Sequence, residues 1–142
     1  SSVTSTSSDG TYKIGDEIAI TIAFTEAVTV TGTPQLTLET GSSDAVVNYS
    51  SGSTGTTLTF TYTVAAGNAS SDLDYTSTSA LALNSGTIKD AAGNNATLTL
   101  ASPGASNSLG ANKALVVDGI VPTMTITATD GSSAVSDGAT TE

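Results

Sequence analysis

Two segments of the chain alternate between apolar and other side chains with a period of two residues, and this pattern constrains the fold most. In EIAITIAF (17–24), every second side chain is large and apolar. In TLTFTYTV (57–64), apolar or aromatic side chains alternate with threonine. Successive side chains of an extended strand point to opposite faces. Each segment therefore predicts a strand with one face in the core and the other in water.

Four shorter segments also predict strands, namely 34–40, 45–50, 96–100 and 114–118. Clusters of Gly, Asn, Asp and Ser lie between them and supply the backbone conformations that tight turns need. A helical turn near 79–83 is the one helical piece that we expect. About seven short strands at close spacing predict an all-β fold, an antiparallel β-sandwich.

The composition limits both the core and the partners. Aromatic residues make up 4% of the chain and there is no Trp, so the core must consist mainly of Val, Ile, Leu and Ala. Thirteen acidic residues stand against three basic ones, and the formal net charge is −10. Such a chain is repelled by nucleic acid and by anionic membrane surfaces and can attract divalent cations. No apolar run approaches the ~18 residues of a membrane-spanning helix, so we expect neither a nucleic-acid partner nor membrane insertion.

The residues that catalytic sites use most often are missing. The sequence has no Cys and no His, which excludes disulfides, thiolate metal sites, and Ser-His-Asp or Cys-His arrangements. No G-x-S-x-G follows a strand, and the phosphate loop G-x-x-x-x-G-K-[ST] is missing. A glycosidase needs two carboxylates at a cleft. Asp72 and Asp74 could share a strand face, but there is no Trp to stack on a sugar. We therefore expect no catalytic residues and no enzyme activity.

A weak internal repeat links the two ends of the chain. With a shift of 121 residues, VTSTSSDGTYKIGD (3–16) aligns with MTITATDGSSAVSD (124–137). Each segment contains a strand-like stretch, then Asp-Gly, then a second Asp seven residues after the first. A repeat of about 120 residues fits one sandwich domain in a tandem array. The alternative is a coincidence between two Ser/Thr-rich stretches.

The repeat sets the expected domain boundaries. Residues 1–121 form one whole sandwich domain, and residues 122–142 form a hinge and the first strand of a following domain. The hinge is Ile120-Val121-Pro122, because Pro cannot occupy a central strand and stiffens the junction.

Several motifs taken together resemble a known family. They are DGTYKIGDEIAITIAF, VTVTGTPQLTLETG, LTFTYTVAAG, SDLDY, IKDAAGN and SLGANKALVVDGIVP. They are similar to the Ig-like (cadherin-like) tandem repeats of giant bacterial surface proteins, which include the extender regions of RTX-type adhesins and SwmB-like cell-surface proteins. The resemblance covers residues 9–122. It implies an extracellular, cell-surface Ig-like β-sandwich used in tandem, often with Ca²⁺ at or near the domain junctions. The tail after Pro122 lacks the Tyr and the Gly-Asp of TYKIGD, which implies that the next domain is of a different subtype.

Calcium is the expected cofactor. Ca²⁺ takes about 6–8 oxygen ligands from carboxylates, amide and backbone carbonyls, and water. Most of the acidic residues lie at predicted loops and strand ends. The candidate ligands are Asp9, Asp16, Glu17, Asp72, Asp74, Asp90, Asn94, Asp118, Asp130 and Asp137.

The carboxylates near the hinge form one candidate calcium site, and the pairs Asp72 with Asp74 and Asp90 with Asn94 form two others. Strand ends gather at the two poles of a sandwich, so Asp118 can converge with Asp130 and Asp137. Asp9 and Asp16 would then face a preceding domain. Like charges repel unless a cation offsets them. The alternative is that the acidic residues only form turns and confer solubility, since the sequence has no EF-hand loop and no glycine-rich nonapeptide repeat.

Three functions remain open. The first is a structural extender repeat of a long extracellular adhesin, with neighbouring repeats as its partners and the cell-surface or glycan ligand elsewhere in the array. The second is a module that binds glycan or protein through loops 41–56 or 101–113. Only one aromatic residue, Tyr49, lies in these loops, which argues against this function. The third is a fibre subunit that donates its C-terminal strand (123–142) to a neighbouring copy by β-strand addition.

Overall fold

The computed structural model describes residues 1–124 and 126, which form an all-β fold with one short helix. The strands are β1 (Ser2–Ser5), β2 (Gly10–Lys13), β3 (Glu17–Thr31), β4 (Gln35–Leu38), β5 (Ala45–Ser51), β6 (Gly55–Thr63), β7 (Ala69–Ser70), β8 (Leu81–Ala82), β9 (Thr87–Asp90) and β10 (Leu115–Asp118). Helix α1 (Leu109–Asn112) follows the N-cap Ser108, whose Oγ accepts the N–H of Ala111 at 3.1 Å.

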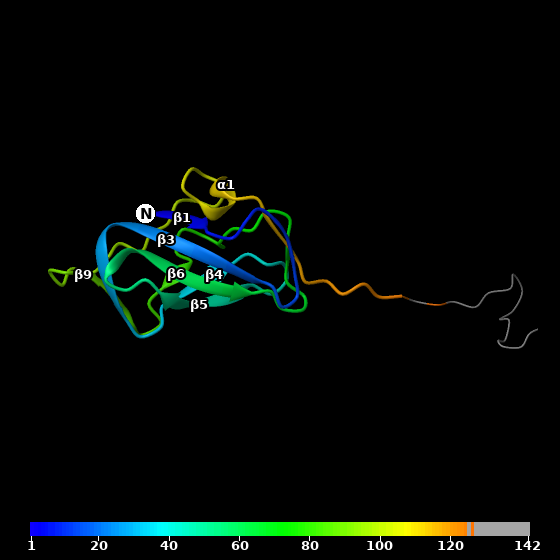
Figure 1. The fold of residues 1–142 in the computed structure, drawn as a ribbon, viewed down its shortest axis with the longest axis horizontal. Helices are drawn as coiled ribbons and strands as arrows, with labels where there is room; N and C mark the ends of the chain where they lie inside the picture. The colour runs from blue at the N-terminus through cyan, green and yellow to red at the C-terminus, as the bar shows by residue number, and fades with distance from the viewer. Residues whose placement is uncertain (125, 127–142) are drawn as a thin grey trace, which may run out of the picture.

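The larger sheet has seven strands in the order β1-β3-β6-β5-β4-β8, and β9 pairs with β3 outside this path (Figure 1). Strand β3 organises this sheet. Its first half pairs antiparallel with β1 and β6. After an irregularity between Ala23 and Val28, its second half pairs antiparallel with β9. Such irregularities bend a strand and increase its twist, so one long strand serves two parts of the sheet.

The smaller sheet has the order β2-β10-β7. Strands β2 and β10 are parallel, with Asp118 opposite Lys13. The segment after β7 also reaches the larger sheet, because the N–H of Glu39 donates to the carbonyl of Asp74 at 2.9 Å. The described chain is therefore an all-β, sandwich-like fold, as the sequence predicts.

The core is aliphatic, as the composition requires. The three isoleucines of the first half of β3 are fully buried, and so are Leu58 and Phe60 of β6. On the opposite face of β6, Thr59 is half-buried, and Thr61 and Thr63 are exposed. Leu115 and Val117 of β10 are buried in the same cluster, so both sheets contribute to one core.

Two local predictions are wrong. Residues 96–100 form no strand; Leu100 is buried nevertheless, and its N–H donates to the carbonyl of Thr78 at 2.9 Å. Residues 79–83 form no helical turn but contain β8, which pairs with β4. Alternation reports which side chains are buried, whereas a strand also needs a neighbour along its whole length, and 96–100 lacks one.

The chain enters and leaves the described domain at opposite poles (Figure 1). Ser2 pairs with Ala23, far along β3, whereas Glu17 at the start of β3 pairs with Thr63. The chain leaves near Glu17, because the carbonyl of Gly119 accepts the N–H of Gly67 in the loop after β6 at 2.9 Å.

The N-terminal pole comprises Ser1 and residues 23–28, 52–55 and 90–95. The C-terminal pole comprises residues 13–17, 41–44, 65–68 and 118–120.

Candidate functional site

Asp16 closes the turn between β2 and β3 at the C-terminal pole. Its Oδ2 accepts the backbone N–H of Lys13 at 3.0 Å, and its Oδ1 lies 3.1 Å from the Lys13 ammonium. The backbone hydrogen bond first, and the ammonium second, lower the pKa of Asp16. The neighbouring Glu17 is exposed, so this pole presents two carboxylates side by side in the sequence.

Asp118 lies at the same pole, where the chain leaves β10. Its Oδ1 accepts the N–H of Ile120 at 3.2 Å. Gly119 is held between these residues, and its N–H donates to the carbonyl of Asn68 at 2.6 Å. A Cβ at Gly119 would lie 2.4 Å from the carbonyl oxygen of Ala65. The backbone around Gly119 therefore fixes where the chain leaves the domain.

Asp9 and Asp16 do not face the same way, in contrast to the expectation that both face a preceding domain. Asp9 lies beside the start of β10, where its Oδ1 accepts the N–H of Ala114 at 2.9 Å and lies 3.4 Å from the Lys113 ammonium. The hydrogen bond from Ala114 is the main cause of a lowered pKa of Asp9. Because β2 runs parallel to β10, it carries Asp16 to the pole that holds Asp118.

Asp72 and Asp74 lie in different environments. Asp72 is exposed, whereas Asp74 is 9% exposed. Oδ1 of Asp74 accepts the N–H of Tyr75, and Oδ2 accepts the N–H of Gly104, both at 2.9 Å. Asp74 therefore fastens the turn that contains Gly104 to the core, and both of its oxygens already have a partner.

Asp90 and Asn94 lie together at the N-terminal pole. The backbone N–H of Asn94 donates to Oδ1 of Asp90 at 2.8 Å, and its side-chain Nδ2 donates to Oδ2 at 3.0 Å. The amide side chain of Asn94 is the largest cause of a lowered pKa of Asp90, followed by its backbone N–H. Here Asn94 is a donor to the carboxylate, and the pair closes the turn after β9.

Within residues 1–124 and 126, no three acidic side chains gather closely enough to hold a metal ion. The predicted ligands Asp130 and Asp137 lie outside the described residues. In the same part of the chain, no helix has the length and apolar character needed to cross a membrane.

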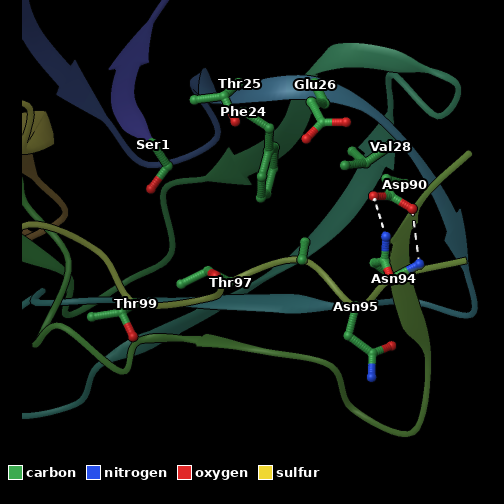
Figure 2. Close-up of a pocket in the computed structure, with 11 residues that line it drawn as sticks. Ser1, Phe24, Thr25, Glu26, Val28, Asp90, Asn94, Asn95, Thr97 and Thr99 are labelled. Atoms are coloured by element: carbon green, nitrogen blue, oxygen red, sulfur yellow. Dashed lines mark hydrogen bonds between the residues drawn. The ribbon is translucent and has the colours of Figure 1, made fainter. Parts of the chain in front are cut away.

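A pocket of about 330 Å³ opens at the N-terminal pole. Figure 2 shows the ring of Phe24 pointing into it, with Ser1 and Thr97 on one side and Glu26 and Asp90 on the other. The full lining is Ser1, Phe24, Thr25, Glu26, Val28, Asp90, Asn94, Asn95, Ala96, Thr97 and Thr99.

Sequence reasoning missed this pocket. The alternation of 17–24 assigns Phe24 to the core face together with Ile18. The irregularity after Ala23 instead leaves Phe24 partly buried at the margin of the core. Only the change of sheet partner along β3 reveals that position.

A second cavity, of about 380 Å³, lies between β5 and β6 near the C-terminal pole. The two strands pair at Tyr49 and Phe60 and at Ser51 and Thr59. Residues 45–48 pair with β4 and with no residue of β6, so β5 and β6 separate here. Val46 at this opening is 55% exposed.

The loops proposed for glycan or protein recognition do not display their one aromatic ring. Tyr49 packs edge-on against Phe60, with the ring centroids 6.0 Å apart. Its hydroxyl accepts the N–H of Ser53 at 2.8 Å. The ring therefore serves packing between β5 and β6.

Comparisons of this chain with family models, with curated proteins and with solved structures found no match.

Proposed function

We propose that this chain is a structural extender repeat of a long extracellular, cell-surface adhesin, and that Ca²⁺ braces the junctions between its domains. The observation that carries the proposal is the placement of the chain ends. β1 begins at one pole, and the chain after β10 leaves at the other (Figure 1). Domains joined through opposite poles stack end to end, so that each copy adds its length to a rod.

The charges at the two poles support the calcium part of the proposal. The C-terminal pole carries four carboxylates, of Asp16, Glu17, Asp44 and Asp118, against one ammonium, that of Lys13. The N-terminal pole carries Glu26 and Asp90. Stacked copies bring these carboxylates toward one another, and their repulsion favours a cation between them. Ca²⁺ suits such a set, because carboxylates and backbone carbonyls are its preferred ligands. A site of this kind is complete only when two copies meet.

The fold also suggests which positions share a junction. In a following repeat of the same fold, the position equivalent to Asp9 lies beside β10. The position equivalent to Asp16 lies at the C-terminal pole of that repeat, which is the pole away from the junction. The positions equivalent to Glu26 and Asp90 then face Asp118. We therefore place the bracing ion between Asp118 of one copy and the N-terminal pole of the next.

The test uses a two-copy chain in which residues 1–122 are followed by residues 2–142, so that Pro122 of the first copy takes the place of Ser1 in the second. Small-angle scattering and thermal unfolding are measured in Ca²⁺ and in EDTA. We expect chelation to shorten the particle and lower the melting temperature. Asp118→Asn in the first copy should remove most of this calcium effect, whereas Asp72→Asn, an exposed carboxylate away from the poles, should leave it intact. An extended particle with the same melting temperature in both buffers argues against bracing by calcium.

The cavity between β5 and β6 favours a second candidate, a fibre subunit that accepts a strand from a neighbour. Residues 45–48 and 61–63 flank the opening and are not paired with each other. An extended peptide can add to such exposed strand edges by β-strand addition, and segment 123–142 would be the donor. Native mass spectrometry separates the two candidates. A strand-donating chain assembles, and removal of 123–142 abolishes the assembly, whereas an extender repeat stays monomeric with or without the segment.

A further inference from the structure

We propose that the pocket at the N-terminal pole receives the Ile120-Val121 segment of a preceding copy of this domain and acts as a socket between domains. The proposal rests on the proposed tandem array. It adds the contact that fixes one copy on the next.

The segment that leaves β10 exposes an unusual number of large apolar side chains. Ile120 is 56% exposed, Val121 58%, Met124 81% and Ile126 79%. Elsewhere among the described residues, only Ile14 and Val46 are exposed large hydrophobics. By the internal repeat, Met124 and Ile126 align with the buried Val3 and Ser5 and belong to the first strand of the next domain. Ile120 and Val121 are the adjacent apolar pair left at the junction, and a grouped apolar pair of this kind marks a contact surface, whereas isolated apolar side chains are ordinary.

The internal repeat limits the distance between two copies. With a period of 121 residues, Thr123 is equivalent to Ser2, the first residue of β1. Three residues, 120–122, then separate Gly119, which is bound to Asn68, from the next β1. Since an extended chain spans at most ~3.3–3.6 Å per residue, Gly119 and that β1 lie within about 14 Å. The two poles must therefore be nearly in contact.

The pocket lies where the linking segment has to pass. Ser1 lines it (Figure 2), and the Cα of a residue joined to Ser1 is ~3.8 Å from the Cα of Ser1. In the array, that residue is equivalent to Val121. Pro122 restricts the residue before it to an extended conformation. Val121 and Ile120 thus cross the mouth of the pocket as an extended pair.

The lining of the pocket suits this occupant. Phe24, Val28 and Ala96 offer apolar contact for the two branched side chains. Glu26 and Thr97 can accept hydrogen bonds from the backbone N–H groups of the segment. Residues 120–122 are uncharged, so they fit beside Glu26 and Asp90, where an acidic segment would be repelled.

The experiment measures distances across the junction in the two-copy chain. The natural sequence has no Cys, so Thr57→Cys in each copy gives two unique sites for spin labels at an exposed position of β6. Thr97→Trp in the second copy fills the pocket that faces the junction. The matched control is Thr97→Trp in the first copy, whose pocket has no preceding copy.

We expect a narrow distance distribution in the parent chain and in the control. Thr97→Trp in the second copy should broaden it toward the ~10 Å spread that a flexible linker of three residues allows. Replacing Ile120 and Val121 of the first copy by Ser should broaden it equally, without any change in the pocket.

If the distance distribution stays narrow in the variant with Thr97→Trp in the second copy, the socket proposal is wrong, but the proposal of a rigid array still stands. A broad distribution in the parent chain, in Ca²⁺, overturns both the socket and the extender function.

Discussion

Asn68 connects two parts of the domain, one through its side-chain oxygen and the other through its backbone carbonyl. Its Oδ1 accepts the hydroxyl of Tyr62 at 2.8 Å and the N–H of Ala65 at 3.0 Å. Its own carbonyl accepts the N–H of Gly119. Asn68 is 7% exposed, so few water molecules can replace these partners. The residue thus joins the end of β6 to the point where the chain leaves the domain.

We expect Asn68→Ala to destabilise the domain by about 1–3 kcal/mol, because it leaves a buried hydroxyl and a backbone N–H without an acceptor. Urea unfolding monitored by circular dichroism measures the change. The matched control is Asn48→Ala, which removes an exposed hydrogen bond with Gln35 and should change stability by less than about 0.5 kcal/mol. Equal effects of the two substitutions would show that the buried hydrogen bonds of Asn68 contribute no more to the free energy of unfolding than an exposed hydrogen bond does.

The lowered pKa values of three hydrogen-bonded surface carboxylates predict how the stability of the domain depends on pH in the acid range. The folded-state pKa values of Asp9, Asp16 and Asp90 lie below the ordinary value of 3.8. As the pH falls, the unfolded chain therefore takes up protons first. The stability from these groups is fully present above 3.8 and is lost as the pH falls through the lower folded values. Melting temperatures should decline below about pH 4, and Asp90→Asn should make that decline shallower. A decline of the same steepness in the variant would contradict the role of Asp90.

Two buried tyrosines predict a loss of stability at alkaline pH. Burial raises the pKa of Tyr62 to about 12, and burial together with the nearby charge of Asp74 raises the pKa of Tyr75 to about 12. The unfolded chain loses these protons first, near the ordinary value of 10.0. The stability that they supply is fully present below pH 10 and is lost as the pH rises toward 12. Melting curves between about pH 9 and 12 test this, and Tyr62→Phe should weaken the alkaline decline. An unchanged decline in Tyr62→Phe would assign the alkaline loss to other groups.

At the level of elements, the connection after β10 is fixed by backbone hydrogen bonds, as the strands are. The N–H and carbonyl of Gly119 both bond the loop after β6, and residue 119 has no room for a side chain. Strand β10 is thereby fixed at its last residue, although it is only four residues long. This backbone contact gives the segment 120–122 a defined starting direction.

We expect Gly119→Ala to destabilise the domain by about 1–3 kcal/mol. A Cβ would lie 2.4 Å from the carbonyl oxygen of Ala65 and 2.7 Å from that of Asn68, so backbone must move. Hydrogen exchange should quicken at the amides of Gly67 and Gly119. The neighbouring Ile120→Ala removes only an exposed side chain and should leave stability and exchange unchanged in a single copy. Protection at Gly67 that survives Gly119→Ala would show that another contact fixes the loop.

For the whole molecule, charge opposes compactness. The net charge is −10, and the described residues form two ion pairs, Lys13 with Asp16 and Lys113 with Asp9. Most of the carboxylates of the described residues therefore have no basic partner, and the self-repulsion of so large a net charge destabilises a compact state. The aliphatic core has to outweigh this repulsion without disulfides.

Salt should accordingly stabilise the single domain. Raising NaCl from about 20 mM to 0.5 M shortens the Debye length, and a gain of about 1 kcal/mol corresponds to a rise in melting temperature of roughly 2–8 °C. KCl should act equally, because screening depends on ionic strength alone. If CaCl₂ at equal ionic strength stabilises a single copy no more than NaCl does, the result agrees with a calcium site that is complete only between two copies. A much larger effect of CaCl₂ on one copy would place a site within the domain.

The sequence by itself determined the fold class, the aliphatic core and the burial of Ile18, Leu58 and Phe60. These follow from a local property, the alternation of side chains along a strand, which any window of six to eight residues displays. It also indicated turns in the clusters of Gly, Asn, Asp and Ser between the predicted strands, such as the one that begins at Asp90, because Asp and Asn bond backbone groups close to them in the chain.

Only the tertiary structure decided which strands pair, and therefore where the chemistry lies. The pairing of β2 with β10 places Asp16 at the same pole as Asp118, and the bend in β3 opens the pocket around Phe24. Residues 96–100 have the side chains of a strand but no partner strand. Pairing joins residues that are distant in the sequence, and its free energy depends on the whole packed core, so no local pattern in this chain encodes it.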